Sequence, residues 1–209
     1  MVSVASVIGF VLAWDSVSEH GSTLRVDRWL VDLAVRHRNG SATGVARVLT
    51  QLGSAWVVAP VVVLACTLLV VRRRFLLAGL IVASTAVTAT AVMVVKDLVA
   101  RPRPPVAEHL VEVVGKAFPS GHAAQSVACY AALAWVATRM TTSRVKRIVS
   151  WCVALVIALG IGWSRVYLAV HWPSDVVGGW ALAGAVLAAL IFTDVISAER
   201  KAVASDRAG

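Results

Sequence analysis

The chain has 209 residues, of which 59% are hydrophobic and only 15% are charged. Soluble globular proteins are about half apolar and about a quarter charged, so this composition, with a mean hydropathy of +0.81, argues against a soluble enzyme and a disordered chain. The net charge of +9 would suggest nucleic acid in a soluble protein. In a membrane protein, basic loops and anionic lipid head groups account for such a charge. We therefore expect a membrane protein without a nucleic-acid partner.

The apolar stretches predict about six membrane-spanning helices. A helix needs about 20 apolar residues to cross about 30 Å of hydrocarbon. Stretches without Lys, Arg, Asp or Glu that meet or approach this length are 52–71, 75–95, 117–138, 148–164 and 176–193. The apolar stretch 1–14 is short for a full crossing, and we expect it to form the first span. Because backbone groups in lipid must be paired within each segment, no sheet is expected. The prediction is an all-α integral membrane bundle forming a single domain over residues 1–209.

A polar stretch at 15–51 separates the first two predicted spans. Within it, apolar residues recur at helical spacing over 26–36, namely Val26, Trp29, Leu30, Leu33 and Ala34. The charged residues Arg25, Asp27, Arg28, Asp32 and Arg36 are assigned to the other side. This pattern predicts an amphipathic helix lying at the membrane interface, and a solvated connecting helix is the alternative.

The loops indicate an orientation. Six spans place residues 72–74, the 139–147 loop and the C-terminal tail on one side, where the loops are short. The two sides carry ten basic residues each, so a raw count does not decide the orientation. Because short basic loops weigh most in the positive-inside rule, we expect both termini in the cytoplasm. The opposite, external side then carries the remaining unusual residues, in three clusters at span ends.

The first two clusters supply cations and backbone donors. Lys96 ends a span, and Arg101 and Arg103 follow it among prolines that stop the helix. An anchoring charge run is the alternative interpretation of this cluster. In the second cluster, Ser120 and Gly121 are expected to place free backbone N–H groups at a helix start, where an anion binds readily. His122 follows them; by itself, a membrane histidine is more often a packing residue.

The third cluster contains Arg165, His171 and Asp175. His171 and Asp175 are four residues apart, so a carboxylate on the same helical face can orient the imidazole and make it more basic. A purely structural His–Asp pair is the alternative. With the cations, the three clusters fit phosphoryl transfer. We expect His171 to attack phosphorus and His122 to protonate the leaving oxygen, without a metal ion.

Taken together, Lys96-x6-Arg103-Pro104, Pro119-Ser120-Gly121-His122 and Ser164-Arg165-x5-His171-x3-Asp175 resemble the signature of the phosphatidic acid phosphatase type 2 superfamily. The resemblance implies a metal-independent phosphatase without a cofactor, acting on a lipid phosphate or pyrophosphate at the outer face of a bacterial plasma membrane. It assigns substrate binding to Lys96, Arg103, Ser120, Gly121 and Arg165, and catalysis to His122, His171 and Asp175. The family's six-residue gap selects Arg103 over the competing Arg101.

The sequence leaves several points open. The substrate could be a polyprenyl pyrophosphate, phosphatidylglycerophosphate or phosphatidate. A membrane protein that binds or transports lipid phosphates without hydrolysis is the alternative function, although it would not need both histidines and Asp175. The sequence does not specify an oligomeric state.

Overall fold

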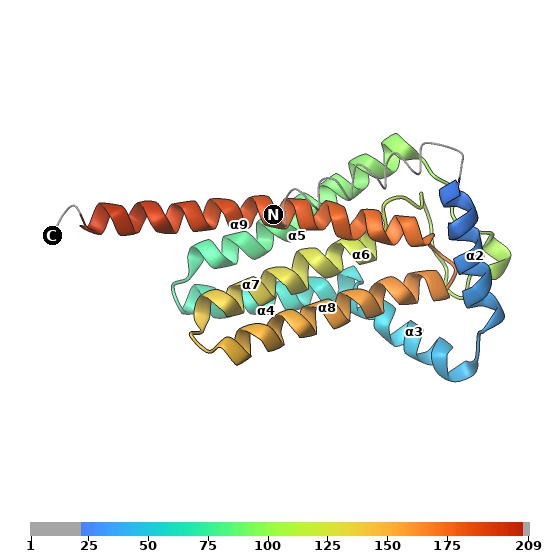
Figure 1. Cartoon of the computed structure of the whole chain (residues 1–209), viewed down its shortest axis with the longest axis horizontal. Coiled ribbons are helices and arrows are strands. Elements are labelled where there is room, and N and C mark those ends of the chain that lie inside the picture. The colour runs from blue at the N-terminus through green and yellow to red at the C-terminus, as the bar shows by residue number, and fades with distance from the viewer. Residues whose placement is uncertain (1–21, 207–209) are drawn as a thin grey trace.

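The computed structural model describes residues 22–206, and the side chains of residues 24–195. The predicted first span, 1–14, lies outside these residues. In chain order the elements are α2 (Ser22–Arg36), α3 (Gly40–Leu52), α4 (Ala55–Val71), α5 (Phe75–Val99), the 3-10 helix η1 (Val106–Glu108), α6 (Gly121–Ser126), the π-helical segment η2 (Val127–Ala131), α7 (Ala132–Met140), α8 (Arg144–Tyr167) and α9 (Pro173–Asp206). The long helices lie side by side, and α2 crosses one end of the bundle (Figure 1).

Helices α5, α8 and the Pro173–Val195 part of α9 are long and apolar enough to cross a membrane. Helices α3 and α4 together could make a further span, bent by 46°. The predicted span 117–138 is helical only from Gly121, and it continues through η2 and α7 to Met140. The later start has a local cause, because Pro119 disfavours helical backbone in the residue before it and Ser120 is extended. The described part of the chain is helical and contains no strand, as the composition predicts.

The bend between α3 and α4 brings the chain against the start of α6. A Cβ atom on Gly53 would lie 2.9 Å from the Ile161 side chain and 3.1 Å from the carbonyl oxygen of His122. Glycine at this position therefore permits a close approach that other residues would obstruct. The helix predicted at 52–71 consequently begins at Ala55, and α3 is a separate helix that the sequence analysis did not predict.

Helix α2 contains the predicted amphipathic segment 26–36 but faces the bundle differently from the expectation. Val26 and Trp29 are exposed, whereas Asp27 is buried together with Val31. Val26 and Trp29 therefore point away from the bundle, as suits a helix that contacts lipid, whereas Leu30, Leu33 and Ala34 line a groove between α2 and the helices beside it. The assignment of Asp27 to a solvated face is wrong, because its carboxylate pairs with a buried arginine described below.

Small residues let α9 pack closely on the start of α6. A Cβ atom on Gly178 would lie 2.4 Å from the Phe118 ring, and one on Gly179 would lie 2.6 Å from the carbonyl oxygen of Ser120. Neither position has room for a larger side chain in this arrangement. The N-terminal turns of α6 and α9 are thereby held against each other at the end of the bundle that α2 crosses (Figure 1).

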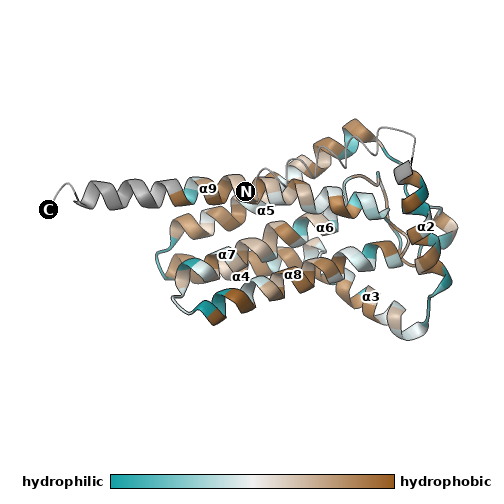
Figure 2. Ribbon diagram, viewed as in Figure 1, coloured by the Kyte–Doolittle hydropathy of each residue, from teal (hydrophilic) through white to brown (hydrophobic). Residues whose placement is uncertain are grey.

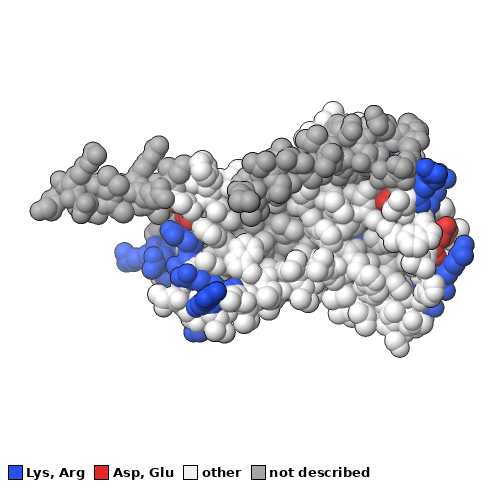
Figure 3. Space-filling view, in the orientation of Figure 1, with Lys and Arg blue, Asp and Glu red and all other residues white. Residues whose placement is uncertain are grey.

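The surface has the polarity of a membrane protein. Hydrophobic residues cover the long helices, and hydrophilic residues concentrate towards their ends (Figure 2). On the face drawn in Figure 3, Lys and Arg gather at the two ends, and the described residues visible between them are almost all uncharged. Large apolar side chains such as Leu68, Phe75 and Val156 are exposed along the helices. Such a surface is suited to lipid rather than water.

Candidate active site

The three sequence clusters meet at the end of the bundle that α2 crosses (Figure 1). Lys96 lies in the last turn of α5, and Gly121 begins α6. Arg165 lies in the last turn of α8, and Asp175 lies in the first turn of α9. Four helices that are distant in sequence thus contribute to one region.

Backbone hydrogen bonds connect the three clusters. The N–H of Ala117 donates to the carbonyl of Arg101 at 2.9 Å, which ties the segment before α6 to the loop after α5. The N–H of Ser120 donates to the carbonyl of Asp175 at 2.9 Å, which ties the start of α6 to the start of α9. The relative positions of the clusters are therefore set by the main chain.

The guanidinium of Arg103 is fixed against His171. Its Nε donates to the carbonyl of Gly115 at 3.0 Å, its Nη2 to that of Val114 at 3.1 Å and its Nη1 to that of Val170 at 2.7 Å. The same Nη1 lies 3.1 Å from Nε2 of His171. A cation anchored to three carbonyls is thereby placed beside one imidazole nitrogen.

The partners of His171 define its tautomer. Nδ1 lies 3.3 Å from Oδ2 of Asp175, an acceptor, so Nδ1 carries the proton. Nε2 faces the donor Arg103 and therefore presents a lone pair. Burial, followed by the positive charges of Arg165, Arg103 and Lys96, lowers the pKa of His171 well below its usual 6.5. A neutral imidazole with its lone pair on Nε2 is the form that can act as a nucleophile.

The guanidinium of Arg101 contacts two carboxylates rather than Nε2 of His171. This residue is only 6% exposed, and it donates through Nη2 to Asp27 at 2.7 Å and through Nη1 to Asp175 at 2.5 Å. Nη1 also contacts the hydroxyl of Ser174 at 2.8 Å. Of the two arginines that competed in the sequence, Arg103 contacts the histidine and Arg101 contacts the carboxylates.

Lys96 and Arg165 complete the group of cations. Arg165 is buried, and its Nη1 donates to the hydroxyl of Thr50 at 2.7 Å, while its buried Nε lacks a hydrogen-bond partner. The ammonium of Lys96 donates to the carbonyl of Lys116. The charges of Lys96, Arg103 and Arg165 act on both imidazoles, His122 and His171. These five predicted site residues therefore share one electrostatic environment.

The start of α6 differs in detail from the prediction. The N–H of Ser120 is not free, because it donates to the carbonyl of Asp175. The free backbone donors begin one residue later, since the first N–H groups of a helix, here from Gly121 onward, lack an acceptor within the helix. The Ser120 hydroxyl is buried without a hydrogen-bond partner, and His122 lies in the first turn, partly exposed.

Four residues around the site were missed by the sequence analysis: Asp27, Thr50, Trp172 and Ser174. The backbone N–H of Trp172 donates to Oδ2 of Asp175 at 2.9 Å, and both the N–H and the hydroxyl of Ser174 donate to Asp27. For Asp27 a signal existed, because it lies three or four residues from Leu24 and Val31 and so shares a helical face with them. Thr50 carries no comparable signal, because its role depends on contact with a distant helix.

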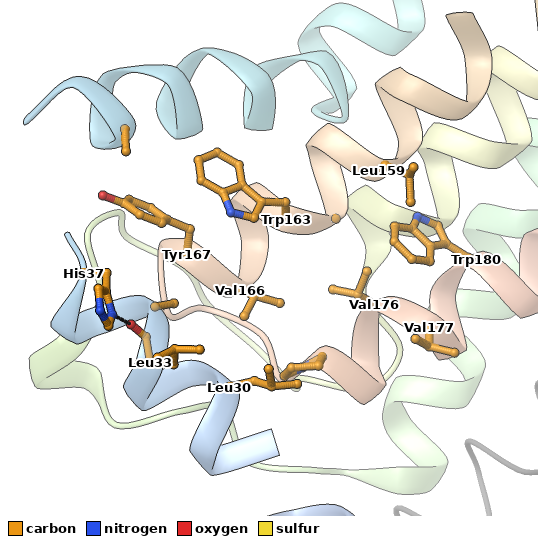
Figure 4. Close-up of a pocket in the computed structure, with 14 residues that line it drawn as sticks. Leu30, Leu33, His37, Leu159, Trp163, Val166, Tyr167, Val176, Val177 and Trp180 are labelled. Atoms are coloured by element: carbon orange, nitrogen blue, oxygen red, sulfur yellow. Dashed lines mark hydrogen bonds between the residues drawn. The ribbon is translucent and has the colours of Figure 1, made fainter. Parts of the chain in front are cut away.

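An apolar groove lies beside this region, between α2, α8 and α9 (Figure 4). Its volume is about 870 Å³, and its lining includes Leu33, Trp163, Tyr167, Val176 and Trp180. None of the eight predicted site residues contributes to that lining. The groove is therefore distinct from the candidate phosphate site, although both border the connection between α8 and α9.

The fold and the site define an α-helical, multi-pass membrane protein with clustered cations and two imidazoles at one end of its bundle. A family model, described as the PAP2 superfamily, matches residues 74–197. The match covers more than half of the chain, so the chain belongs to the PAP2 superfamily. The resemblance seen in the three motifs is confirmed.

Individual relatives agree with this assignment. A crystal structure of a transmembrane PAP2-type phosphatidylglycerolphosphate phosphatase from Bacillus subtilis aligns with a TM-score of 0.84 and 25% identity, covering 92% of this chain and 95% of that one. Aquifex aeolicus LpxE aligns with a TM-score of 0.60 and 20% identity over 78% of this chain and 92% of its own, which supports the fold alone. Phosphatidylglycerophosphatase B of Bacillus subtilis is 38% identical over 91 residues, which are 43% of this chain and 44% of that relative. The chain thus matches less than half of that relative's length.

Proposed function

We propose that this protein is a phosphatase that hydrolyses the phosphate or pyrophosphate group of a membrane lipid. The observation that carries the proposal is the environment of His171. Asp175 occupies Nδ1, and the anchored cation Arg103 lies at Nε2. A phosphoryl group bound by Arg103 would lie next to the lone pair that attacks it.

The proposed reaction has two steps. In the first, Nε2 of His171 forms a bond to phosphorus while the bond to the leaving oxygen breaks, and His122 donates a proton to that oxygen. In the second, water attacks phosphorus, His122 accepts its proton, and the N–P bond breaks to release inorganic phosphate. Lys96, Arg103 and Arg165, with the backbone donors from Gly121, neutralise the charge on the phosphoryl oxygens. Ser120 contributes by fixing the start of α6, and Asp175 holds the imidazole.

The relatives indicate which lipid to test first. Two of them carry phosphatidylglycerophosphate phosphatase activity in their names, so we propose phosphatidylglycerophosphate as the leading substrate. A polyprenyl pyrophosphate and phosphatidate are the other candidates. Lipid-phosphate binding or transport without hydrolysis is the competing function, and it predicts binding that survives the loss of either histidine.

A purified sample in EDTA, supplied with each of these lipids, tests the proposal through the phosphate released. We expect turnover by the wild type, and a loss of about 10³-fold or more for His171→Gln. An exposed histidine in the same protein, His37, provides the matched control, and His37→Gln should behave as the wild type. Radiolabelled lipid should leave acid-labile label on the protein, and the label should be absent from His171→Gln. A folded sample that binds these lipids and turns none of them over would favour the transport function.

We also propose that the site faces the outside of the cell. The basic residues 72–74, between α4 and α5, and the basic start of α8 lie at the end of the bundle opposite α2 (Figure 1), and the positive-inside rule places short basic segments of this kind in the cytoplasm. Val106 is exposed at the end that carries the site. In intact cells, a membrane-impermeant thiol reagent should label Val106→Cys and leave Arg73→Cys unlabelled. The reverse pattern would place the site inside.

A further inference from the structure

A buried chain of charges links α2 to the candidate nucleophile. Arg101 lies between two carboxylates and contacts Asp27 through Nη2 and Asp175 through Nη1. Ser174 reinforces the link, since its backbone N–H donates to Oδ1 of Asp27 at 3.0 Å. The second oxygen of Asp175, Oδ2, is left to face His171 and accepts the backbone N–H of Trp172. Three segments of the chain, namely α2, the loop after α5 and the stretch 171–175, therefore fix the orientation of one carboxylate.

Stability alone is a weak reason for this arrangement. The side chains of Asp27, Arg101 and Asp175 are 3%, 6% and 0% exposed. Removing charges from water is costly, and replacing a buried ion pair with apolar residues is often neutral or stabilising. The triad also carries two negative charges and one positive, so it leaves an excess negative charge, which lies next to an imidazole that becomes positively charged on attack.

The guanidinium of Arg101 suits such a role. Its planar fork contacts the two carboxylates through different nitrogens, so the position of Asp27 on α2 determines where Asp175 is held. The guanidinium carbon also lies 5.7 Å from the centre of the Trp172 ring, which borders the same connection. The side-chain hydrogen bonds of Arg101 go to Asp27, Ser174 and Asp175 and not to His171, so we expect its effect on the reaction to pass through Asp175.

We propose that Arg101 and Asp27 are positioning residues, which hold the Asp175 carboxylate with Oδ2 directed at Nδ1 of His171. The inference rests on the proposed function in taking His171 as the nucleophile, and it adds a role for α2. This helix lies across the site end of the bundle with Val26 and Trp29 exposed. The Asp27 carboxylate points inward from α2 to Arg101. The packing of α2 on the bundle therefore affects the geometry of the His171–Asp175 pair.

Several charged groups face the His171–Asp175 pair, and the experiment must leave them unchanged: Lys96 on α5, Arg103 on the loop after it, His122 on α6 and Arg165 on α8. Arg101→Gln removes only the cation of the triad. Arg101→Lys keeps the charge without the fork. Asp27→Asn removes the distal carboxylate, and Asp32→Asn, at an exposed position of the same helix, is its matched control.

Two readouts are combined: steady-state kinetics with the best lipid substrate, and NMR titration of ¹⁵N-labelled histidines in micelles, with His171 assigned through His171→Gln. For Arg101→Gln we expect kcat to fall about 10²-fold with KM nearly unchanged. The titration of His171 should move about one pH unit higher, because Asp175 loses its cation. Arg101→Lys should titrate as the wild type and lose about 10-fold in kcat, because one ammonium cannot reproduce the fork. Asp27→Asn should also lower kcat about 10-fold, and Asp32→Asn should leave kcat unchanged.

The other outcomes overturn the inference. Unchanged kcat in Arg101→Gln would do so, as would a rise in KM alone, which would make Arg101 a phosphate ligand. A loss of activity that follows a loss of folded protein, with the His171 titration unmoved, would show a structural role only. If the wild type hydrolyses no lipid phosphate and the titration still moves, the proposed function fails and the positioning stands. If the wild type hydrolyses no lipid phosphate and the His171 titration does not move either, both the proposed function and the positioning role are refuted.

Discussion

The contact between α6 and α9 yields a quantitative prediction for Gly179→Ala. A Cβ atom at this position would lie 2.6 Å from the carbonyl oxygen of Ser120 and 3.1 Å from the backbone nitrogen of Ala124. These two atoms form the first hydrogen bond of α6. Since both belong to the main chain, neither can move without displacing the turn that carries His122.

The expected free-energy change can be worked from this geometry. Overpacking costs about 1–3 kcal/mol, and loss of the hydrogen bond from the Ala124 N–H to the Ser120 carbonyl adds about 1 kcal/mol. Replacing a helical glycine by alanine returns about 1 kcal/mol. The net loss in the free energy of unfolding is therefore about 1–3 kcal/mol. Gly79→Ala is the control, because a Cβ atom at this position in α5 meets nothing within 4 Å and should stabilise by about 1 kcal/mol.

Thermal unfolding in detergent and phosphate release below the unfolding temperature measure the two consequences. Gly179→Ala should unfold at a lower temperature than Gly79→Ala, and its kcat should fall about 10²-fold because the start of α6 shifts relative to His171. If Gly179→Ala matched Gly79→Ala in stability and activity, the close approach of α9 to α6 would not hold the site together, and the reasoning would be refuted.

Three further predictions follow from the site. Thr50→Val leaves Nη1 of Arg165 without its acceptor, so unfolding should become easier by about 1–3 kcal/mol and kcat/KM should fall, as thermal unfolding and kinetics would reveal. Arg103→Ala should lower kcat/KM about 10²–10³-fold, and a loss below about threefold would contradict its place beside His171. Because the pKa of His171 is lowered, kcat/KM should persist below pH 6.5. As pH falls, His171 takes up a proton at a higher pH in the unfolded chain than in the folded chain, so the free energy of unfolding should decrease below about pH 6.5. A free energy of unfolding that did not change with pH in this range would contradict the prediction.

Motif spacing predicted most of the residues that converge at the site, and the structure explains why it could not predict the rest. Arg101 and Arg103 are two residues apart among prolines, and the residues alone did not distinguish them; the resemblance to a family did. The contacts that separate them, to Asp27 and Asp175 for one and to His171 for the other, depend on how distant segments pack.

For two of the three errors in the fold, the local sequence did contain a signal that would have given the correct prediction. At helical spacing Asp27 lies on the same face as Leu24, Leu30 and Val31, which indicates an inward direction. It was nevertheless assigned to the solvated side because it is charged. Helix α3 was overlooked although its N-cap is recognisable, since the side chain of Asn39 accepts the N–H of Ala42 at 2.9 Å. The close approach at Gly53, by contrast, depends on Ile161 and His122 and cannot be seen in the local sequence.

The contact of Arg103 with Nε2 of His171 would make the reactivity of this proposed nucleophile conditional on charge. While the guanidinium donates to that nitrogen, its lone pair is engaged and cannot attack. A dianionic head group could replace Nε2 as an acceptor of Nη1 while Nε and Nη2 stay on their carbonyls, whereas an uncharged electrophile offers no comparable acceptor. The cation proposed to bind the substrate would thus also shield the imidazole of the resting protein from neutral alkylating and acylating molecules in the bilayer.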